Sequence, residues 1–131
     1  MMRTLPDIID FHAGKSPDRE AFRFQSKGLT YRDLSLLSDR LSQTLKDLGV
    51  QRGDHVGIFS PKSLEVPVAI YGILKSGAAY VPLDPKTPPA RLEKILRDAQ
   101  IRVLITVPEL LGVLQASLDS GTISAIIGCD A

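Results

Sequence analysis

This sequence of 131 residues has almost no cysteine, no tryptophan and no large excess of either charge. It has one cysteine, no tryptophan, and 16 Lys and Arg against 15 Asp and Glu, which leaves a formal charge of +1. A single cysteine cannot form an intramolecular disulfide, which excludes the framework of small secreted domains and favours the cytoplasm. The balanced charge offers no electrostatic basis for binding nucleic acid or an anionic membrane surface. We therefore expect neither as a partner.

Long apolar runs are also missing. No segment approaches the about 20 uninterrupted apolar residues of a membrane-spanning helix, and the acidic start of the chain lacks the apolar centre of a signal peptide. Hydrophobic residues nevertheless make up 44% of the chain and charged residues 24%, which is typical of a globular domain with a core. We expect one domain over residues 1–131 and no second domain.

The apolar residues alternate between helical and strand spacing. Helical spacing covers 5–13, 31–48, 63–74, 88–99 and 109–118. Short apolar runs predict buried strands over 55–59 and 78–83 and two further strands over 101–107 and 123–129. A small hairpin is expected over 21–31, with its turn at 26–28. Strands that alternate with helices of this length predict a parallel sheet with right-handed crossovers. The predicted fold class is therefore α/β, a three-layer Rossmann-like sandwich with a mostly parallel sheet.

Two helices carry the clearest local signals. In the first, the apolar residues are three or four apart: Tyr31, Leu34, Leu37, Leu41, Leu45 and Leu48. Thr30 and Asp33 have capping-box spacing before it, and Gly49 follows its end. The second helix, expected from Ser63, has Glu65 as its one charged residue between positions 64 and 74, so it should be covered on nearly all sides.

No glycine motif identifies a nucleotide site. No two glycines are two residues apart, which excludes a Gly-x-Gly dinucleotide loop. Gly72 and Gly77 have the separation of the P-loop glycines, but Ala78 and Ala79 stand where Lys and Ser or Thr would be needed. The Pro-rich stretch 84–89 reads instead as a loop that delivers Thr87 as a helix cap.

The few nucleophilic or basic side chains have structural explanations. Cys129, His55 and Asp54 could form a nucleophilic set, but Cys129 ends an apolar strand, where a buried and inert thiol is commoner. His12 lies on an apolar helix face and should pack or cap. Two histidines and one cysteine are also too few for an ordinary zinc site. We predict no catalytic, cofactor-binding or metal-binding residue in this chain.

Three further side-chain groups are expected to be structural. Glu93 and Arg97, four residues apart in the mixed-charge segment 91–98, predict a weak ion pair on a solvated helix face. Tyr31 and Tyr80 should pack at the edge of the core, where each hydroxyl can reach a polar partner.

Two stretches resemble core motifs of the adenylate-forming enzymes, the acyl-CoA synthetases, luciferases and peptide-synthetase adenylation domains. Residues 29–34 (LTYRDL) with 45–56 resemble the first motif, and residues 74–85 (LKSGAAYVPLDP) resemble the second. Arg91-Leu92 and residues 103–106 match segments that normally follow. The resemblance spans nearly the whole chain and implies the partial N-terminal subdomain of an acyl-CoA-synthetase-like fold. Because the chain stops directly after a strand that needs a cover, we expect it to be a piece of a longer enzyme.

The resemblance implies a chemistry for that longer enzyme. It would activate a carboxylic acid, acyl or amino, with ATP and Mg²⁺ as an acyl adenylate, and pass the acyl group to the thiol of CoA or of a carrier-protein phosphopantetheine. The phosphate loop, the ribose-binding aspartate and the catalytic lysine of such enzymes follow the region matched here. The fragment alone should therefore be inactive, with the remainder of the parent enzyme as its partner.

The matched motif residues should have structural roles. Gly77 would let a helix end close to the next strand, and Pro82 with Pro85 would stiffen the exit loop. Two alternatives stay open: a free-standing, non-catalytic α/β interaction or regulatory module derived from the same scaffold, and a small hydrolase using Cys129.

Overall fold

A four-stranded parallel sheet with the strand order β4-β3-β5-β6 forms the centre of the computed structural model, which describes residues 4–128. A separate two-stranded hairpin, β1-β2, stands at one end. The elements are α1 (Leu5–Lys15), β1 (Glu20–Phe24), β2 (Lys27–Thr30), α2 (Tyr31–Asp47), β3 (His55–Phe59), α3 (Glu65–Lys75), β4 (Ala79–Leu83), α4 (Pro89–Asp98), β5 (Val103–Thr106), the short 3₁₀ turn η1 (Pro108–Leu110), α5 (Leu111–Asp119) and β6 (Ala125–Gly128).

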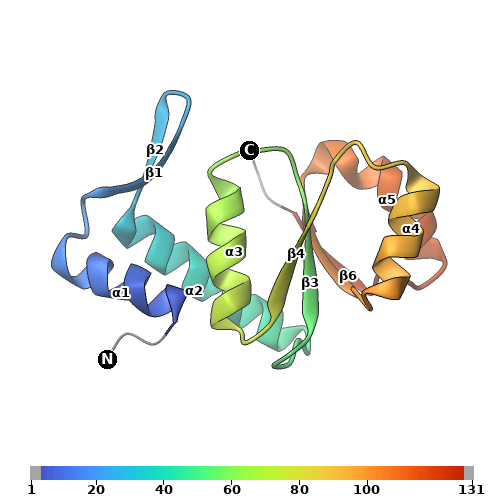
Figure 1. Ribbon diagram of the computed structural model, residues 1–131, viewed down its shortest axis with the longest axis horizontal. Helices are drawn as coiled ribbons and strands as arrows, with labels where there is room; N and C mark the ends of the chain where they lie inside the picture. Colours follow the sequence, from blue (N-terminus) through green and yellow to red (C-terminus); the bar gives the residue numbers. More distant parts are fainter. Residues whose placement is uncertain (1–3, 129–131) are drawn as a thin grey trace.

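Helices cover both faces of the four-stranded sheet (Figure 1). On one face, Leu45 of α2 and Ile73 of α3 pack against β3 and β5. On the other, Leu92 of α4 and Leu114 of α5 pack against Leu104 of β5. The prediction of a three-layer α/β sandwich is therefore confirmed.

Strand β4 lies at an edge of the sheet, so the prediction that residues 78–83 form a buried strand is wrong. Ala79, Tyr80 and Pro82 are exposed. The Ala79 N–H points toward β3 and donates to the Asp54 carbonyl 2.8 Å away. Successive N–H groups of a strand point to opposite sides, so the backbone groups of residues 79, 81 and 83 face β3 and those of residues 80 and 82 face away from it. The nitrogen of Pro82 therefore faces the open edge, where its missing N–H costs no ladder bond. An apolar run does not distinguish an edge strand from a central one.

The first residues form a smaller unit beside the sheet. Helix α1 and the hairpin pack on α2 around Ile9, Leu29 and Leu34. The predicted hairpin is confirmed, but its turn is earlier than expected: Phe24 pairs with Lys27, and Gln25 adopts a left-handed φ of 56°. Helix α1 also runs through Gly14, because a single glycine inside a helix is tolerated.

The buried face of α2 differs from the predicted leucine stripe. Leu37 and Leu48 are exposed, and the buried face includes Ser38 and Ser42 between Leu34 and Leu45. Helix α3 packs closely against this face of α2. Gly72 of α3 has no side chain, and a Cβ placed on it would lie only 2.8 Å from Cγ of Leu41 in α2. Small serines fit such a contact, and a hydrophobicity pattern does not detect them. The Thr30 half of the predicted capping box and the predicted end are confirmed: Thr30 Oγ1 accepts the Asp33 N–H, and Gly49 has a φ of 90°.

Two helix starts also differ from prediction. Helix α3 begins at Glu65 and not at Ser63, and most of its residues are only half-buried. Helix α4 begins at Pro89 after Pro88, because the Thr87 hydroxyl donates to the Asp84 carbonyl within the loop and does not cap the helix.

Candidate functional site

The carboxyl ends of β3 and β5 occupy the position where an open parallel sheet ordinarily binds a ligand. In an open parallel sheet, ligands bind where neighbouring strands send their chains to opposite faces. Here α3 follows β3 on one face, and α5 follows β5 on the other. Phe59 and Thr106, the last residues of these strands, are fully buried, and Thr106 Oγ1 donates to the Phe59 carbonyl at 2.7 Å. The protein's own groups thus fill the position between these two strand ends.

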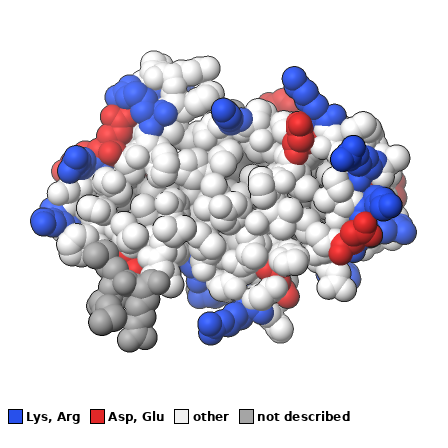
Figure 2. Space-filling model, viewed as in Figure 1, with Lys and Arg blue, Asp and Glu red and all other residues white. Residues whose placement is uncertain are grey.

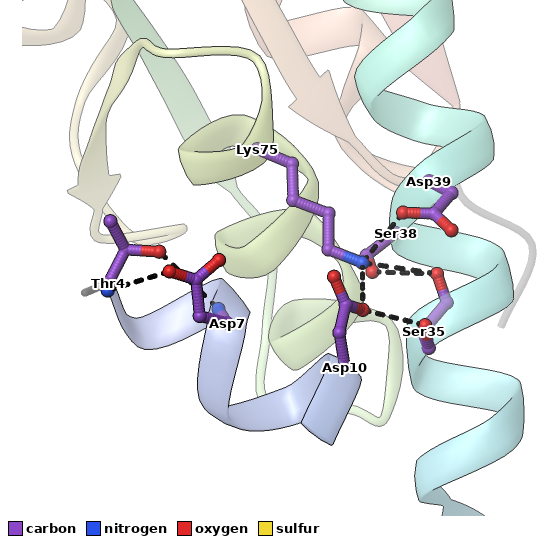
Figure 3. Close-up of polar contacts among 7 residues, drawn as sticks. All are labelled: Thr4, Asp7, Asp10, Ser35, Ser38, Asp39 and Lys75. Carbon is purple, nitrogen blue, oxygen red and sulfur yellow. Dashed lines mark hydrogen bonds and ion pairs between the residues drawn. The ribbon is translucent and has the colours of Figure 1, made fainter. Parts of the chain in front are cut away.

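A polar cluster that joins three helices surrounds Lys75 at the end of α3 (Figure 3). Lys75 Nζ lies 3.0 Å from Asp10 Oδ1 of α1 and 2.7 Å from Asp39 Oδ1 of α2. It also donates to the Ser35 carbonyl at 3.3 Å, and the Ser35 hydroxyl donates to Asp10. The Lys75 side chain is 9% exposed, against 51% and 61% for the two aspartates.

This geometry makes Lys75 a clamp between three helices. An ammonium has three N–H donors, and three protein oxygens accept them. A lysine engaged in this way offers neither a free nucleophile nor a base. The position at the C-terminal end of α3 also suits a cation, because the helix dipole is negative there. Gly77 then turns the chain into β4 with a φ of 88°, as expected for its structural role.

A cleft of about 780 Å³ lies beside the Lys75 clamp. Its charged lining residues are Asp7, Asp10, Asp39, Lys46, Arg52 and Lys75. Three negative and three positive groups cancel, so the lining favours no ligand of one charge. We assign the cleft no ligand.

Glu93 forms a second polar cluster, between α4 and the end of α5. Its carboxylate accepts hydrogen bonds from the hydroxyls of Ser117, Ser120 and Thr122, the last at 2.6 Å, and pairs with Arg97 at 3.0 Å. The bonds from Ser117 and Thr122 are the main cause that lowers the Glu93 pKa to about 2, with smaller contributions from Ser120 and Arg97. The predicted ion pair is confirmed. The solvated face is confirmed for Arg91, Lys94, Arg97 and Asp98, which are exposed. Glu93 alone is half-buried, because it is held by hydroxyls that lie too far away in the sequence for a helix pattern to show.

The lowered pKa of Glu93 predicts a pH dependence of stability. A carboxyl group whose pKa falls on folding stabilises the fold above its ordinary value of 4.5, and the effect is lost as the pH falls toward 2. Glu93→Gln should therefore lower the melting temperature at pH 7, and the difference from the wild type should narrow between pH 5 and pH 2. Thermal melts read by circular dichroism measure this. Glu109→Gln, at an exposed glutamate, is the control; an equal effect there would contradict the assignment.

Of the possible nucleophilic set, the structure describes His55 and Asp54, and each has a backbone partner. His55 Nδ1 lies 2.8 Å from the Ala99 carbonyl, and Asp54 Oδ2 accepts the Gln51 N–H. Cys129 lies outside the residues that the structure describes. His12 stacks on Tyr31 with ring centroids 5.0 Å apart, so both pack as expected. Tyr80 does not: it is 39% exposed, because α3 covers β3 and leaves this side of β4 open.

The described part of the chain contains neither a metal-binding cluster nor a membrane-spanning helix. Among residues 4–128, no three His, Cys, Asp or Glu side chains lie together in a way that could hold a metal ion. Over the same residues, no helix combines the length and apolar character needed to cross a membrane.

Sequence comparison matches residues 9–129 to a family described as AMP-binding enzyme. Gramicidin S synthase 2 of Brevibacillus brevis is 34% identical over 118 residues, which is 90% of this chain and 3% of that protein. Tyrocidine synthase 2 of Brevibacillus parabrevis is 38% identical over 116 residues, which is 88% of this chain and 3% of that protein.

Solved structures give the same result for the fold. The anthranilate CoA ligase AuaEII, in complex with anthranoyl-AMP, superposes with a TM-score of 0.86 at 28% identity, over 95% of this chain and 24% of that one. The nonribosomal peptide synthetase FmoA3, in an α-methyl-L-serine-AMP bound form, superposes with a TM-score of 0.82 at 30% identity, over 96% of this chain and 14% of that one. This chain thus spans a quarter or less of the length of each of these proteins.

Proposed function

This chain belongs to the family of AMP-binding enzymes, and we propose that it forms the N-terminal framework of an AMP-forming ligase. That enzyme would activate an acyl or amino acid with ATP as an acyl adenylate and transfer the acyl group to a thiol of CoA or of a carrier protein. The observation that carries the proposal is the family match over residues 9–129. It is supported by the superposition on two proteins whose structures hold acyl-AMP compounds.

In this proposal residues 1–131 are one structural unit without catalytic residues, and the remainder of the ligase is its partner in the cytoplasm. The clamp at Lys75 and the Glu93 cluster support this role, because both hold helices together and leave no reactive group free. The described residues do not fit ATP or Mg²⁺ by themselves: they bring no metal-binding group of side chains together, and Gly72 packs against Leu41 inside a helix contact. In this proposal, residues 1–131 therefore take no part in a catalytic step.

The proposal predicts opposite results for the chain alone and in a chimera. The purified chain should show no carboxylate-dependent ATP–pyrophosphate exchange with a panel of fatty, aryl and amino acids. AuaEII with its matched quarter replaced by this chain should exchange pyrophosphate in the presence of anthranilate, at least about tenfold above an AuaEII that simply lacks that quarter. FmoA3 with the same replacement is a second host. Exchange by the isolated chain, or folded but inactive chimeras in both hosts, would refute the proposal.

A further inference from the structure

One face of the structure carries almost no charge. In Figure 2, Lys, Arg, Asp and Glu side chains lie around the margin of the view and leave its centre, over α3 and β4, white. The sequence agrees, since Lys75 is the one charged residue between Val66 and Leu83, and the clamp buries it. We call this surface the α3–β4 face and define it by Pro67, Ile70, Tyr71, Tyr80 and Pro82.

The arrangement of β4 shows why this face is open. Val81 and Leu83 pack into the core cluster that includes α4 and α5. Since successive side chains of a strand point to opposite faces, Tyr80 and Pro82 lie on the α3 side of the sheet. Both are exposed there, Tyr80 by 39%. Helix α3 thus covers β3 and leaves the same side of β4 uncovered, although parallel sheets are ordinarily covered on both faces.

Aromatic side chains gather at the same place. The rings of Phe22 and Tyr71 are 6.5 Å apart, and Phe22 is 38% exposed. Burial raises the pKa of Tyr71, and the phenols of Tyr31 and Tyr80 raise it further. Partly exposed aromatic side chains on an uncharged surface are typical of the core of a protein–protein interface.

We infer that the remainder of the ligase packs against the α3–β4 face. The inference rests on the proposed function. Its occupant is an apolar layer of the same enzyme: AuaEII, of which this chain covers 24%, has about three-quarters of its length beyond the match. The half-buried outer side of α3, Pro67 and Ile70 among its residues, and the open side of β4 both need such a cover.

Photo-crosslinking in the chimeras tests the inference. Benzoylphenylalanine replaces Tyr80 in one sample and Leu111, which is 42% exposed on α5, in the control. After irradiation, mass spectrometry should find crosslinks from position 80 to peptides of the host and none, or at least tenfold fewer, from position 111. A folded and active chimera in which position 80 crosslinks no more than position 111 overturns the inference and leaves the proposed function standing. If the chimeras fold in both hosts but neither exchanges pyrophosphate, the proposed function fails, and the inference fails with it.

A charge substitution gives an independent readout. In the isolated chain, Tyr80→Lys and Leu111→Lys should both leave the melting temperature nearly unchanged, because both sites are exposed. In the chimera, Tyr80→Lys should reduce pyrophosphate exchange at least about tenfold, and Leu111→Lys should leave it unchanged. Equal activity of the two variants would refute the inference. So would a tight dimer of the isolated chain that Tyr80→Lys dissociates, since a second copy would then be the occupant.

Discussion

Replacing Leu104 with alanine is expected to lower the free energy of unfolding by about 2–5 kcal/mol. Leu104 is in the central strand β5, is fully buried, and packs with Phe59, Leu92 and Leu114. Truncation would remove apolar contacts and leave a cavity that strands held on both sides cannot close. Since small domains are stable by only about 5–15 kcal/mol, this loss is a large share of the total. Urea unfolding read by circular dichroism measures it.

Gly57 of β3, which lies beside Leu104, provides a second variant that tests the packing at this site. A methyl group at Gly57 would overlap Cδ1 of Leu104 and lie 3.1 Å from Cδ1 of Leu83, so Gly57→Ala should cost about 1–3 kcal/mol by overpacking. Leu104→Ala removes the overlapping atom. The double variant should therefore be less destabilised than the sum of the single ones. Strictly additive losses would show that the two sites do not share this space. Leu111→Ala, at an exposed leucine, should cost little.

Replacing Lys75 with methionine should lower the free energy of unfolding by about 2–3 kcal/mol. The aliphatic stem would remain, but Asp10 and Asp39 would lose the cation that both contact. Removing one partner of a fully buried ion pair costs more, and the half-exposed aspartates reduce the expected value. The loss should be concentrated at the junction of α1 with α2 and α3, so amide hydrogen exchange in α1 should accelerate more than exchange in β5.

Two further variants separate charge from packing at the Lys75 clamp. Combining Lys75→Met with Asp10→Asn and Asp39→Asn removes the uncompensated carboxylates and should recover part of the lost stability. Lys46→Met changes an exposed lysine that lines the same cleft and should have little effect. A Lys75→Met variant as stable as Lys46→Met would show that the clamp contributes nothing to the fold.

The local elements of this protein could be read from its sequence because their signals are short-range. The cap of α2 needs only Thr30 and Asp33, and its end needs only Gly49 in a left-handed conformation. The alternation of apolar strands with helices was enough to predict a parallel three-layer sandwich. The resemblance of residues 29–34 and 74–85 to adenylate-forming enzymes likewise agreed with the family match and with the superposed structures.

The sequence did not show which surfaces meet. The buried serines of α2 became visible only with α3 packed at Gly72, and the hydroxyls around Glu93 only with α5 folded onto α4. Lys75 shows the same limit, since Asp10 lies 65 residues away from it and Asp39 lies 36 away. Such contacts depend on which helices pack against one another, and residue spacing carries no record of that packing.

By itself, then, the sequence determined the fold class, the two ends of α2 and the family of this protein, because these depend on periodicity, local turn geometry and motifs read along the chain. The tertiary structure alone decided that β4 is an edge strand, that Lys75 is enclosed by two aspartates and that the α3–β4 face is open. The physical reason is that burial is a property of neighbours in space. An apolar run such as 78–83 looks the same whether another strand or helix covers it or not.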